Sequence, residues 1–298
     1  MLNAVERKIE QFVAELNDKE VSALYGKLPH GKRLRAKLIL KIAGHTLPVV
    51  KTAAVVEMIH AASLLHDDVI DDAYTRRAKP SLNALYGNKI AIMLGDILYS
   101  KGFFELNMIS ADVAKMVSNA VTQLSLGELK DVSLSKAFNT DKEIYLEMIY
   151  QKTASLIEAS AGAAALLAGK PPKPYMRYGR NLGMAFQMID DLLDITSDEK
   201  TLGKPALHDF VEGKTTLPYL YLYEVLDSNG KQKLASLHGR VLTKAEQNWI
   251  KTEMEERQIL LKCYAQAREL IDEAVELMNS RGEEVLSGIA LEMIERDF

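Results

Sequence analysis

Cysteine, tryptophan, proline and long apolar runs are all scarce in this chain of 298 residues. Cys263 is the only cysteine, which excludes a disulfide framework and a cysteine metal site and fits a reducing compartment. Charged residues interrupt every apolar stretch before it reaches the roughly 18 residues of a membrane span. The formal net charge of −4 gives no basic footprint, so we expect no nucleic-acid partner.

The beginning of the sequence also lacks an apolar leader. Residues 1–8 read Met-Leu-Asn-Ala-Val-Glu-Arg-Lys, so acidic and basic side chains interrupt the stretch at once. We therefore expect no signal peptide and a cytoplasmic protein.

Helix-forming residues dominate what is present. Leu, Ala, Met, Glu and Lys are abundant, and no runs of strict apolar and polar alternation stand out. Apolar residues recur at helical spacing, as at Val5, Ile9 and Phe12. With 48% hydrophobic and 26% charged residues, the composition is that of an ordinary globular protein. We predict an all-α fold in which residues 1–298 form a single domain, one large helical bundle.

Some helix boundaries can be predicted from local signals. Thr140-x-x-Glu143 and Thr243-x-x-Glu246 have the pattern of capping boxes, which start helices. Loops are expected near residues 72–82 and 228–243, among others.

Two aspartate-rich clusters of the same DDxxD pattern occupy residues 67–71 and 190–194. Residues four apart on a helix project from nearly the same face, so the outer carboxylates of each cluster align. A largely apolar run precedes each cluster and should lie against the core. One such cluster alone is typical of a solvated helix face. Two of them predict carboxylates on facing walls at the rim of a shared cavity, where they suit Mg²⁺ held with a substrate's phosphates.

Basic residues accompany the acids. Gly31-Lys32-Arg33-Leu34-Arg35 opens a helical stretch whose N-terminus suits an anion, and His60 precedes Asp67 by two helical turns. Two diphosphates carry about −3 each, and the six clustered aspartates add roughly −6. About three Mg²⁺ offset half of this total negative charge. The lysines and arginines must supply the rest. Both signs together argue for ionisation of a diphosphate ester, with metal taking up the charge of the leaving group.

Residues 66–72 with Arg76-Arg77, and residues 186–194, resemble the two signature motifs of the trans-isoprenyl (polyprenyl) diphosphate synthases. The likeness spans residues 31 to 218 and includes Lys152-Thr153 and the lysines near 203–218. It departs from the family where Ala36 and Ala78 replace a proline and a glycine, which bears on loop rigidity rather than on charge. The resemblance implies an isoprenoid synthase fold around a deep central cavity, and a homodimer. It also implies head-to-tail condensation of an allylic diphosphate, such as farnesyl or geranyl diphosphate, with isopentenyl diphosphate. We expect a long all-trans product for quinone side chains, with transient membrane contact for its release.

By similarity, each candidate residue has an expected role. The Mg²⁺ ligands are expected to be Asp67, Asp71 and Asp190, supported by Asp68, Asp191 and Asp194. The allylic diphosphate is expected to contact Arg76, Lys152, Lys204 and Lys214. Isopentenyl diphosphate is expected to contact Lys32, Arg35, His60 and Arg77. Thr153 and Gln187 are expected to face the developing allylic cation.

Product length should depend on the residues that lead into the first cluster. Ala62 and Ser63 stand five and four residues before Asp67, and Ile59 is about one turn further back. In short-chain relatives a bulky aromatic near the first two positions closes the tunnel. Both residues are small here, so we expect an open upper tunnel and a long product, with a floor deeper down near Val121 and Leu124.

Alternative functions are distinguished by particular residues. A class I terpene cyclase also ionises a diphosphate at a DDxxD, but it needs no isopentenyl diphosphate site such as Lys32, Arg35 and His60. A non-catalytic subunit of a heteromeric synthase should lack one acidic cluster. A short-chain farnesyl or geranylgeranyl diphosphate synthase should carry a bulky residue near Ala62. A structural helical protein with incidental Ca²⁺ sites would need no basic partners.

Overall fold

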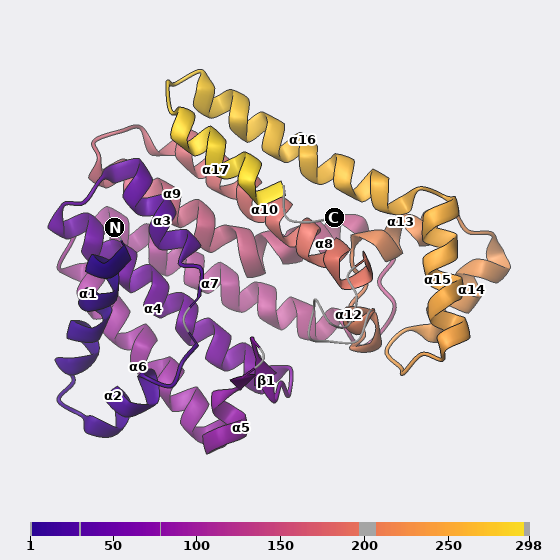
Figure 1. The fold of residues 1–298 in the computed structure, drawn as a ribbon, viewed down its shortest axis with the longest axis horizontal. Helices are drawn as coiled ribbons and strands as arrows, with labels where there is room; N and C mark the ends of the chain where they lie inside the picture. Colours follow the sequence, from indigo (N-terminus) through magenta and orange to yellow (C-terminus); the bar gives the residue numbers. More distant parts are fainter. Residues whose placement is uncertain (1, 30, 78, 197–206, 295–298) are drawn as a thin grey trace. The chain divides into compact units, whose positions relative to one another are not determined.

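The computed structural model describes residues 2–29, 31–77, 79–196 and 207–294, and these form helices almost throughout (Figure 1). The predicted all-α class is therefore confirmed. The chain divides into two compact units. Unit 1 comprises Met1–Thr122 and Leu156–Gly179, and unit 2 comprises Gln123–Ser155 and Arg180–Phe298. That all residues form a single domain stays a prediction.

Unit 1 is built around α4. Its elements are α1 (Leu2–Ala14), α2 (Lys19–Tyr25), α3 (Leu34–Ala43), α4 (Leu47–Ile70), β1 (Thr75–Arg76), β2 (Lys79–Pro80), α5 (Leu82–Tyr86), α6 (Asn88–Asn107), the first part of α7 (Ala111–Leu134) and most of α9 (Ser155–Leu167). Helices α1, α3, α5 and α6 all pack against α4 (Figure 1). By length and composition α4 could cross a membrane, but 67% of its most apolar window is buried inside the protein. Its apolar surface is therefore that of a core helix.

Close packing of α6 on α4 depends on a glycine. A Cβ at Gly102 would lie 3.3 Å from Val55 Cγ1 and 3.5 Å from Ile59 Cγ1, so even one added methyl would press on the side chains of α4. After α4 the chain forms a two-stranded antiparallel hairpin, in which Arg76 pairs with Lys79. The sequence predicts only a loop here, because two-residue strands leave no alternation to detect.

Unit 2 contains the second half of the chain's helices. They are the end of α7, α8 (Lys142–Ile149), the π-helix η1 (Tyr150–Ala154), most of α10 (Pro172–Thr196), α12 (His208–Val211), α13 (Leu217–Val225), α14 (Ser228–Leu237), α15 (Lys244–Glu256), α16 (Ile259–Asn279) and α17 (Glu284–Ile294). Helix α13 packs against α8, α14, α15 and α16, and α17 packs back along α16 (Figure 1).

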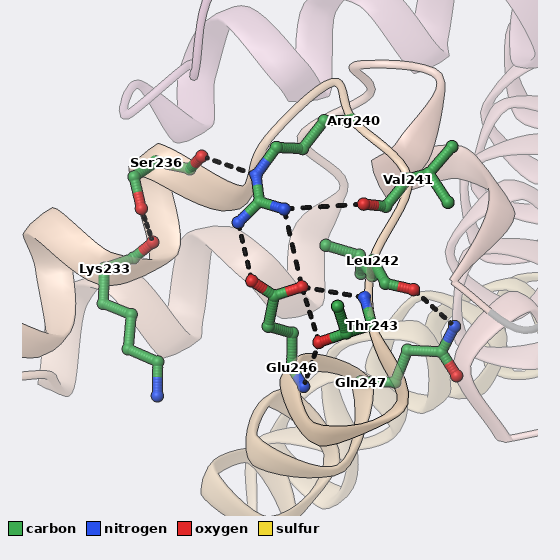
Figure 2. Close-up of polar contacts among 8 residues, drawn as sticks. All are labelled: Lys233, Ser236, Arg240, Val241, Leu242, Thr243, Glu246 and Gln247. Atoms are coloured by element: carbon green, nitrogen blue, oxygen red, sulfur yellow. Dashed lines mark hydrogen bonds and ion pairs between the residues drawn. The ribbon is translucent and has the colours of Figure 1, made fainter.

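One predicted capping box is confirmed and the other is wrong. Figure 2 shows Thr243 at the start of α15, where Thr243 N donates to Glu246 Oε2 and Glu246 N donates to Thr243 Oγ1. Arg240 pairs with the same carboxylate at 2.7 Å. At α8 the N-cap is Asp141, whose carboxylate accepts from two backbone amides and replaces Thr140 in that role. Aspartate is the stronger N-cap of the two, and the spacing from Thr140 to Glu143 takes no account of this competing residue.

The predicted loop at 228–243 is also wrong, because α14 occupies its first ten residues. Asp227 caps this helix by accepting from Gly230 N. Ser228, Asn229 and Gly230 are poor helix formers, but a capped first turn tolerates them, and the buried Leu234 and Leu237 anchor the helix.

Candidate active site

Both DDxxD clusters lie on long helices, the first at the end of α4 and the second on α10. Helix α4 ends at Ile70, and Asp71 is its C-cap, with Asp71 N donating to Asp67 O at 2.8 Å. Helix α10 is described as far as Thr196, two residues after Asp194. The C-terminus of a helix carries partial negative charge from its macrodipole, so the end of α4 is an unfavourable place for carboxylates unless a cation joins them.

In unit 1 the aspartates face two environments. Asp67 and Asp71 are half-buried, whereas Asp68 is buried. Asp68 Oδ1 accepts from Arg76 Nε at 2.7 Å, and Arg76 Nη2 lies 2.7 Å from the same oxygen. Asp68 therefore holds the hairpin arginine in place, which leaves Asp67 and Asp71 as the outward pair of the first cluster.

A second group of side chains in unit 1 is strongly basic. Gly31 allows Arg77 to reach the loop before α3, since a Cβ at Gly31 would lie 2.9 Å from Arg77 Nη1, and Arg77 donates to Pro29 O. Arg35 is half-buried, and within the described residues its Nε has no hydrogen-bond partner. The structure thus brings Arg35, His60 and Arg77 into one neighbourhood, with the exposed Lys32 on the adjoining loop.

Arg33 belongs to the same segment but has a structural role. It adopts a left-handed conformation with φ 51° at the N-cap of α3 and forms a two-point ion pair with Glu6 at 2.7 and 3.0 Å. Glu57 on α4 accepts from Arg33 at 3.4 Å and from Ala36 N at 2.9 Å. The segment that carries Lys32 and Arg35 is therefore tied to both α1 and α4.

Burial, followed by the charges of Arg35 and the other nearby arginines, holds the pKa of His60 well below its usual 6.5. Protons bind the unfolded chain in preference to the folded one, so His60 should weaken folding as the pH falls below about 6.5. We expect the free energy of unfolding to fall by up to about 1.4 kcal/mol per pH unit from this group. Urea unfolding between pH 7 and pH 5 should show a shallower decline for His60→Gln. The exposed His45→Gln is the control, and equal declines in all three proteins would contradict this account.

Unit 2 places the second cluster in a hydrogen-bonded network. Asp191 is buried and accepts from Tyr145 Oη and from Gln187 Nε2, while Gln187 Oε1 accepts from Thr153 Oγ1 at 2.8 Å. Burial above all, with the charge of Asp209, raises the pKa of Asp191 to about 8, against the lowering effect of the Tyr145 and Gln187 hydrogen bonds. The predicted residues Thr153 and Gln187 are thereby joined to Asp191, and Asp190 stays half-buried beside it.

Two residues of this network did not emerge from the sequence. Tyr145 stands seven residues before Lys152, two helical turns, which is a spacing that could have suggested a shared face. Asp209 donates its backbone N–H to Asp194 Oδ2 at 3.3 Å, a contact from the short helix α12. No local signal predicts it.

Lys152 lies in the π-helix η1, where it forms ion pairs with Asp131 at 2.6 Å and Glu128 at 2.8 Å. A π-turn inside an α-helical segment commonly marks a functional site.

Lys214 follows a glycine that the fold requires. Gly213 has φ 88°, and a Cβ there would lie 2.4 Å from Ser135 O. Lys214 pairs with Glu212 at 3.1 Å, and Thr215 Oγ1 accepts from Asn139 N. The loop is therefore held to the segment after α7. Lys204, the other predicted lysine of this region, lies outside the described residues.

The predicted chain-length residues are buried in α4. Ile59, Ala62 and Ser63 are 0%, 0% and 4% exposed, and Ser63 Oγ donates to His60 O. Val121 and Leu124 on α7 are also buried. These positions are interior, as a tunnel wall requires, and their contact with a growing chain stays a prediction.

The carboxylates fit a metal that is shared with phosphate. In the part of the chain that the structure describes, no three His, Cys, Asp or Glu side chains form a preformed metal site. Mg²⁺ commonly takes one or two carboxylates and completes its octahedron with substrate phosphates and water. Asp67 and Asp71, one turn apart at a helix C-terminus, provide such a partial ligand set.

Comparisons with known proteins agree on one family. The family model described as polyprenyl synthetase matches residues 19–278. The crystal structure of octaprenyl pyrophosphate synthase from Helicobacter pylori superposes with a TM-score of 0.94 at 42% identity, covering 99% of this chain and 98% of that one. Heptaprenyl diphosphate synthase component 2 from Geobacillus stearothermophilus is 33% identical, covering 100% of this chain and 96% of that protein. Solanesyl-diphosphate synthase 1 from rice is 45% identical, but the match spans only 43% of that protein and 59% of this chain.

Proposed function

The chain belongs to the polyprenyl synthetase family, as a prenyltransferase of the long-chain trans-polyprenyl diphosphate synthase type, and we propose that it condenses isopentenyl diphosphate head to tail with an allylic diphosphate. The observation that carries the proposal is the repeated DDxxD cluster, once on α4 and once on α10, with basic side chains in the same unit. Carboxylates alone would repel a diphosphate, and cations alone would not place metal on the leaving oxygens.

The reaction needs a cation, and this chain's residues fit one. Asp67 and Asp71 in unit 1 and Asp190 in unit 2 are the proposed Mg²⁺ ligands, with about three ions bound together with the diphosphates. When bound, the metal neutralises charge that develops on the departing diphosphate. Asp68 serves the site indirectly by holding Arg76, and Asp191 by holding Gln187.

The allylic diphosphate is proposed to contact Arg76, Lys152, Lys204 and Lys214. Thr153 and Gln187 are proposed to present oxygen dipoles to the allylic carbon as positive charge develops there, because their mutual hydrogen bond fixes both side chains.

Isopentenyl diphosphate is proposed to bind Lys32, Arg35, His60 and Arg77. The support is the surplus of positive charge around His60, of which Glu57 offsets only part. This basic group also argues against a terpene cyclase, which has no second diphosphate to bind.

Arg35→Ala should raise the KM for isopentenyl diphosphate about tenfold to a hundredfold, because a lost charge-assisted contact to phosphate costs about 1.5–3 kcal/mol. The KM for the allylic substrate should change much less. Steady-state kinetics with each substrate varied in turn provide the measurement, and Lys37→Ala, an exposed base on the same helix, is the control. A rise in the allylic KM alone would mean that the two pockets are assigned backwards.

The function itself is tested with the purified chain, Mg²⁺, farnesyl or geranyl diphosphate and labelled isopentenyl diphosphate, followed by sizing of the dephosphorylated product. A long polyprenol, absent when the metal is chelated, is expected. A cyclic hydrocarbon product would indicate a cyclase. A product of about fifteen or twenty carbons would indicate a short-chain synthase, in which a bulky residue closes the tunnel. The Geobacillus relative is named as one component of a synthase, so the chain is assayed alone. No turnover by a folded chain would favour a non-catalytic subunit.

Exposed apolar side chains support a homodimer. Met93 and Phe104 on α6 are 53% and 60% exposed, and Leu129 on α7 is 64% exposed. Met93 and Phe104 are eleven residues apart, about three turns along one face of α6, and exposed apolar side chains gathered on one helix face are typical of a partner surface. Sedimentation velocity would detect the dimer, and a monomer at micromolar concentration would refute it.

We further propose a cytoplasmic enzyme that makes quinone side chains and contacts a membrane transiently to release its product.

A further inference from the structure

Two buried carboxylates on α7 hold the ammonium group of Lys152. Lys152 Nζ lies 2.6 Å from Asp131 Oδ2 and 2.8 Å from Glu128 Oε2. Glu128 and Asp131 are each only 7% exposed. Carboxylates are kept this far from water only when a cation and hydrogen bonds compensate them. The pair therefore belongs to the interior of unit 2 and is not an ordinary surface salt bridge.

The backbone around Lys152 is held against the same helix. A Cβ at Gly127 would lie 2.3 Å from Lys152 N, so only glycine lets α7 and η1 approach this closely. Gln151 Nε2 also donates to Gln123 Oε1. The π-turn is thus fixed to the turns of α7 that precede the ion pair, and the flexible lysine side chain is anchored at its root and at its tip.

The contacts of the Lys152 ammonium group and the net charge around it determine how Lys152 can bind an anion. The ammonium group of Lys152 donates a hydrogen bond to Asp131 Oδ2, whereas its contact with Glu128 is an ion pair in which neither carboxylate oxygen accepts a hydrogen bond from the described residues. Of its three N–H donors, some therefore remain for a ligand. Burial alone would lower the pKa of Lys152, but Asp131 and Glu128 outweigh it and raise that pKa, so the group stays charged. Two carboxylates against one ammonium leave a local net charge of about −1.

We propose that Glu128 and Asp131 are positioning residues that aim the ammonium group of Lys152 at the diphosphate, and that their surplus negative charge lowers the affinity for the bound diphosphate. This inference rests on the proposed function, in which Lys152 contacts the allylic diphosphate. The surplus carboxylate opposes any bound anion, whereas a fixed donor helps most where charge develops on the leaving group. Removing one carboxylate should therefore change turnover and diphosphate binding in opposite directions.

The isosteric variants Asp131→Asn and Glu128→Gln test this. We expect kcat to fall about tenfold to a hundredfold, since a preorganised donor is lost, while inorganic diphosphate with Mg²⁺ binds as tightly as before or more tightly. In a Lys152→Met background, Asp131→Asn should lower kcat less than about twofold further, because Asp131 acts through Lys152. Glu147→Gln is the matched control, since Glu147 is an exposed carboxylate that pairs with Lys130 of α7 at 4.0 Å.

Each outcome decides the matter. A wild-type kcat in both single variants would overturn the proposal. A loss of diphosphate binding that accompanies the loss of kcat would also overturn it. An equal loss on the Lys152→Met background would show that Asp131 acts on the fold. If Lys152→Met does not fold, the opposite changes of kcat and binding in the single variants still decide. Failure of the proposed function is recognised separately, because the wild-type chain would then form no polyprenyl product, whereas calorimetric binding of inorganic diphosphate needs no turnover.

Discussion

Replacing Asp190 by alanine is expected to lower turnover by about two to three orders of magnitude, and Asp67→Ala to do the same. Each change removes a carboxylate from a Mg²⁺ that contributes several kcal/mol of charge stabilisation to the leaving diphosphate, and about 1.4 kcal/mol corresponds to a factor of ten. Steady-state kinetics across a range of Mg²⁺ concentrations should also show a higher half-saturating concentration of the metal.

Folding should survive both substitutions. Asp67 and Asp190 are half-buried, and Asp67 lies at the C-terminus of α4, where loss of a negative charge removes an unfavourable interaction with the macrodipole. Circular dichroism and thermal unfolding of the variants should therefore match the wild type or show a small gain. Asp72→Asn is the control, because Asp72 is an exposed acid next to the first cluster. Asp72 has a φ of 48°, and asparagine tolerates this left-handed conformation. Near-wild-type turnover in folded Asp190→Ala would contradict the role of the second cluster.

Phenylalanine at position 62 or 63 is expected to shorten the product to about fifteen or twenty carbons, because a rigid ring cannot be absorbed by a packed wall. Ala62 and Ser63 are buried, so the ring cannot turn out into solvent. The first condensation should be largely spared, since the change lies on α4 below the carboxylates. Chromatography of dephosphorylated products provides the measurement.

A neighbouring substitution separates blockage from general damage. Leu64→Phe adds an aromatic ring at the next, half-exposed position of α4 and should leave the product long. Overpacking by itself would lower the melting temperature of Ala62→Phe without changing product length. An unchanged long product from both Ala62→Phe and Ser63→Phe would mean that the growing chain does not pass these residues.

The sequence alone determined the helical class, the helices that carry each aspartate cluster and the basic residues that accompany them. These follow from composition and from spacing within one segment, where geometry repeats every 3.6 residues. The Thr243 capping box is of this local kind. The same reasoning failed at Thr140, because Asp141 competes for the same amides, and at α14, where the cap at Asp227 outweighs poor helix formers.

Only the tertiary structure decided which partner each functional side chain has. Spacing places Asp67, Asp68 and Asp71 on one helix turn, but the contact with Arg76 of the hairpin separates Asp68 from the other two. Lys152 was recognisable as a basic residue, yet its pairing with Glu128 and Asp131 depends on the close approach at Gly127. These contacts join residues that are 8 to 24 positions apart in the sequence. Their geometry depends on how whole helices pack, which periodicity within a single segment does not encode.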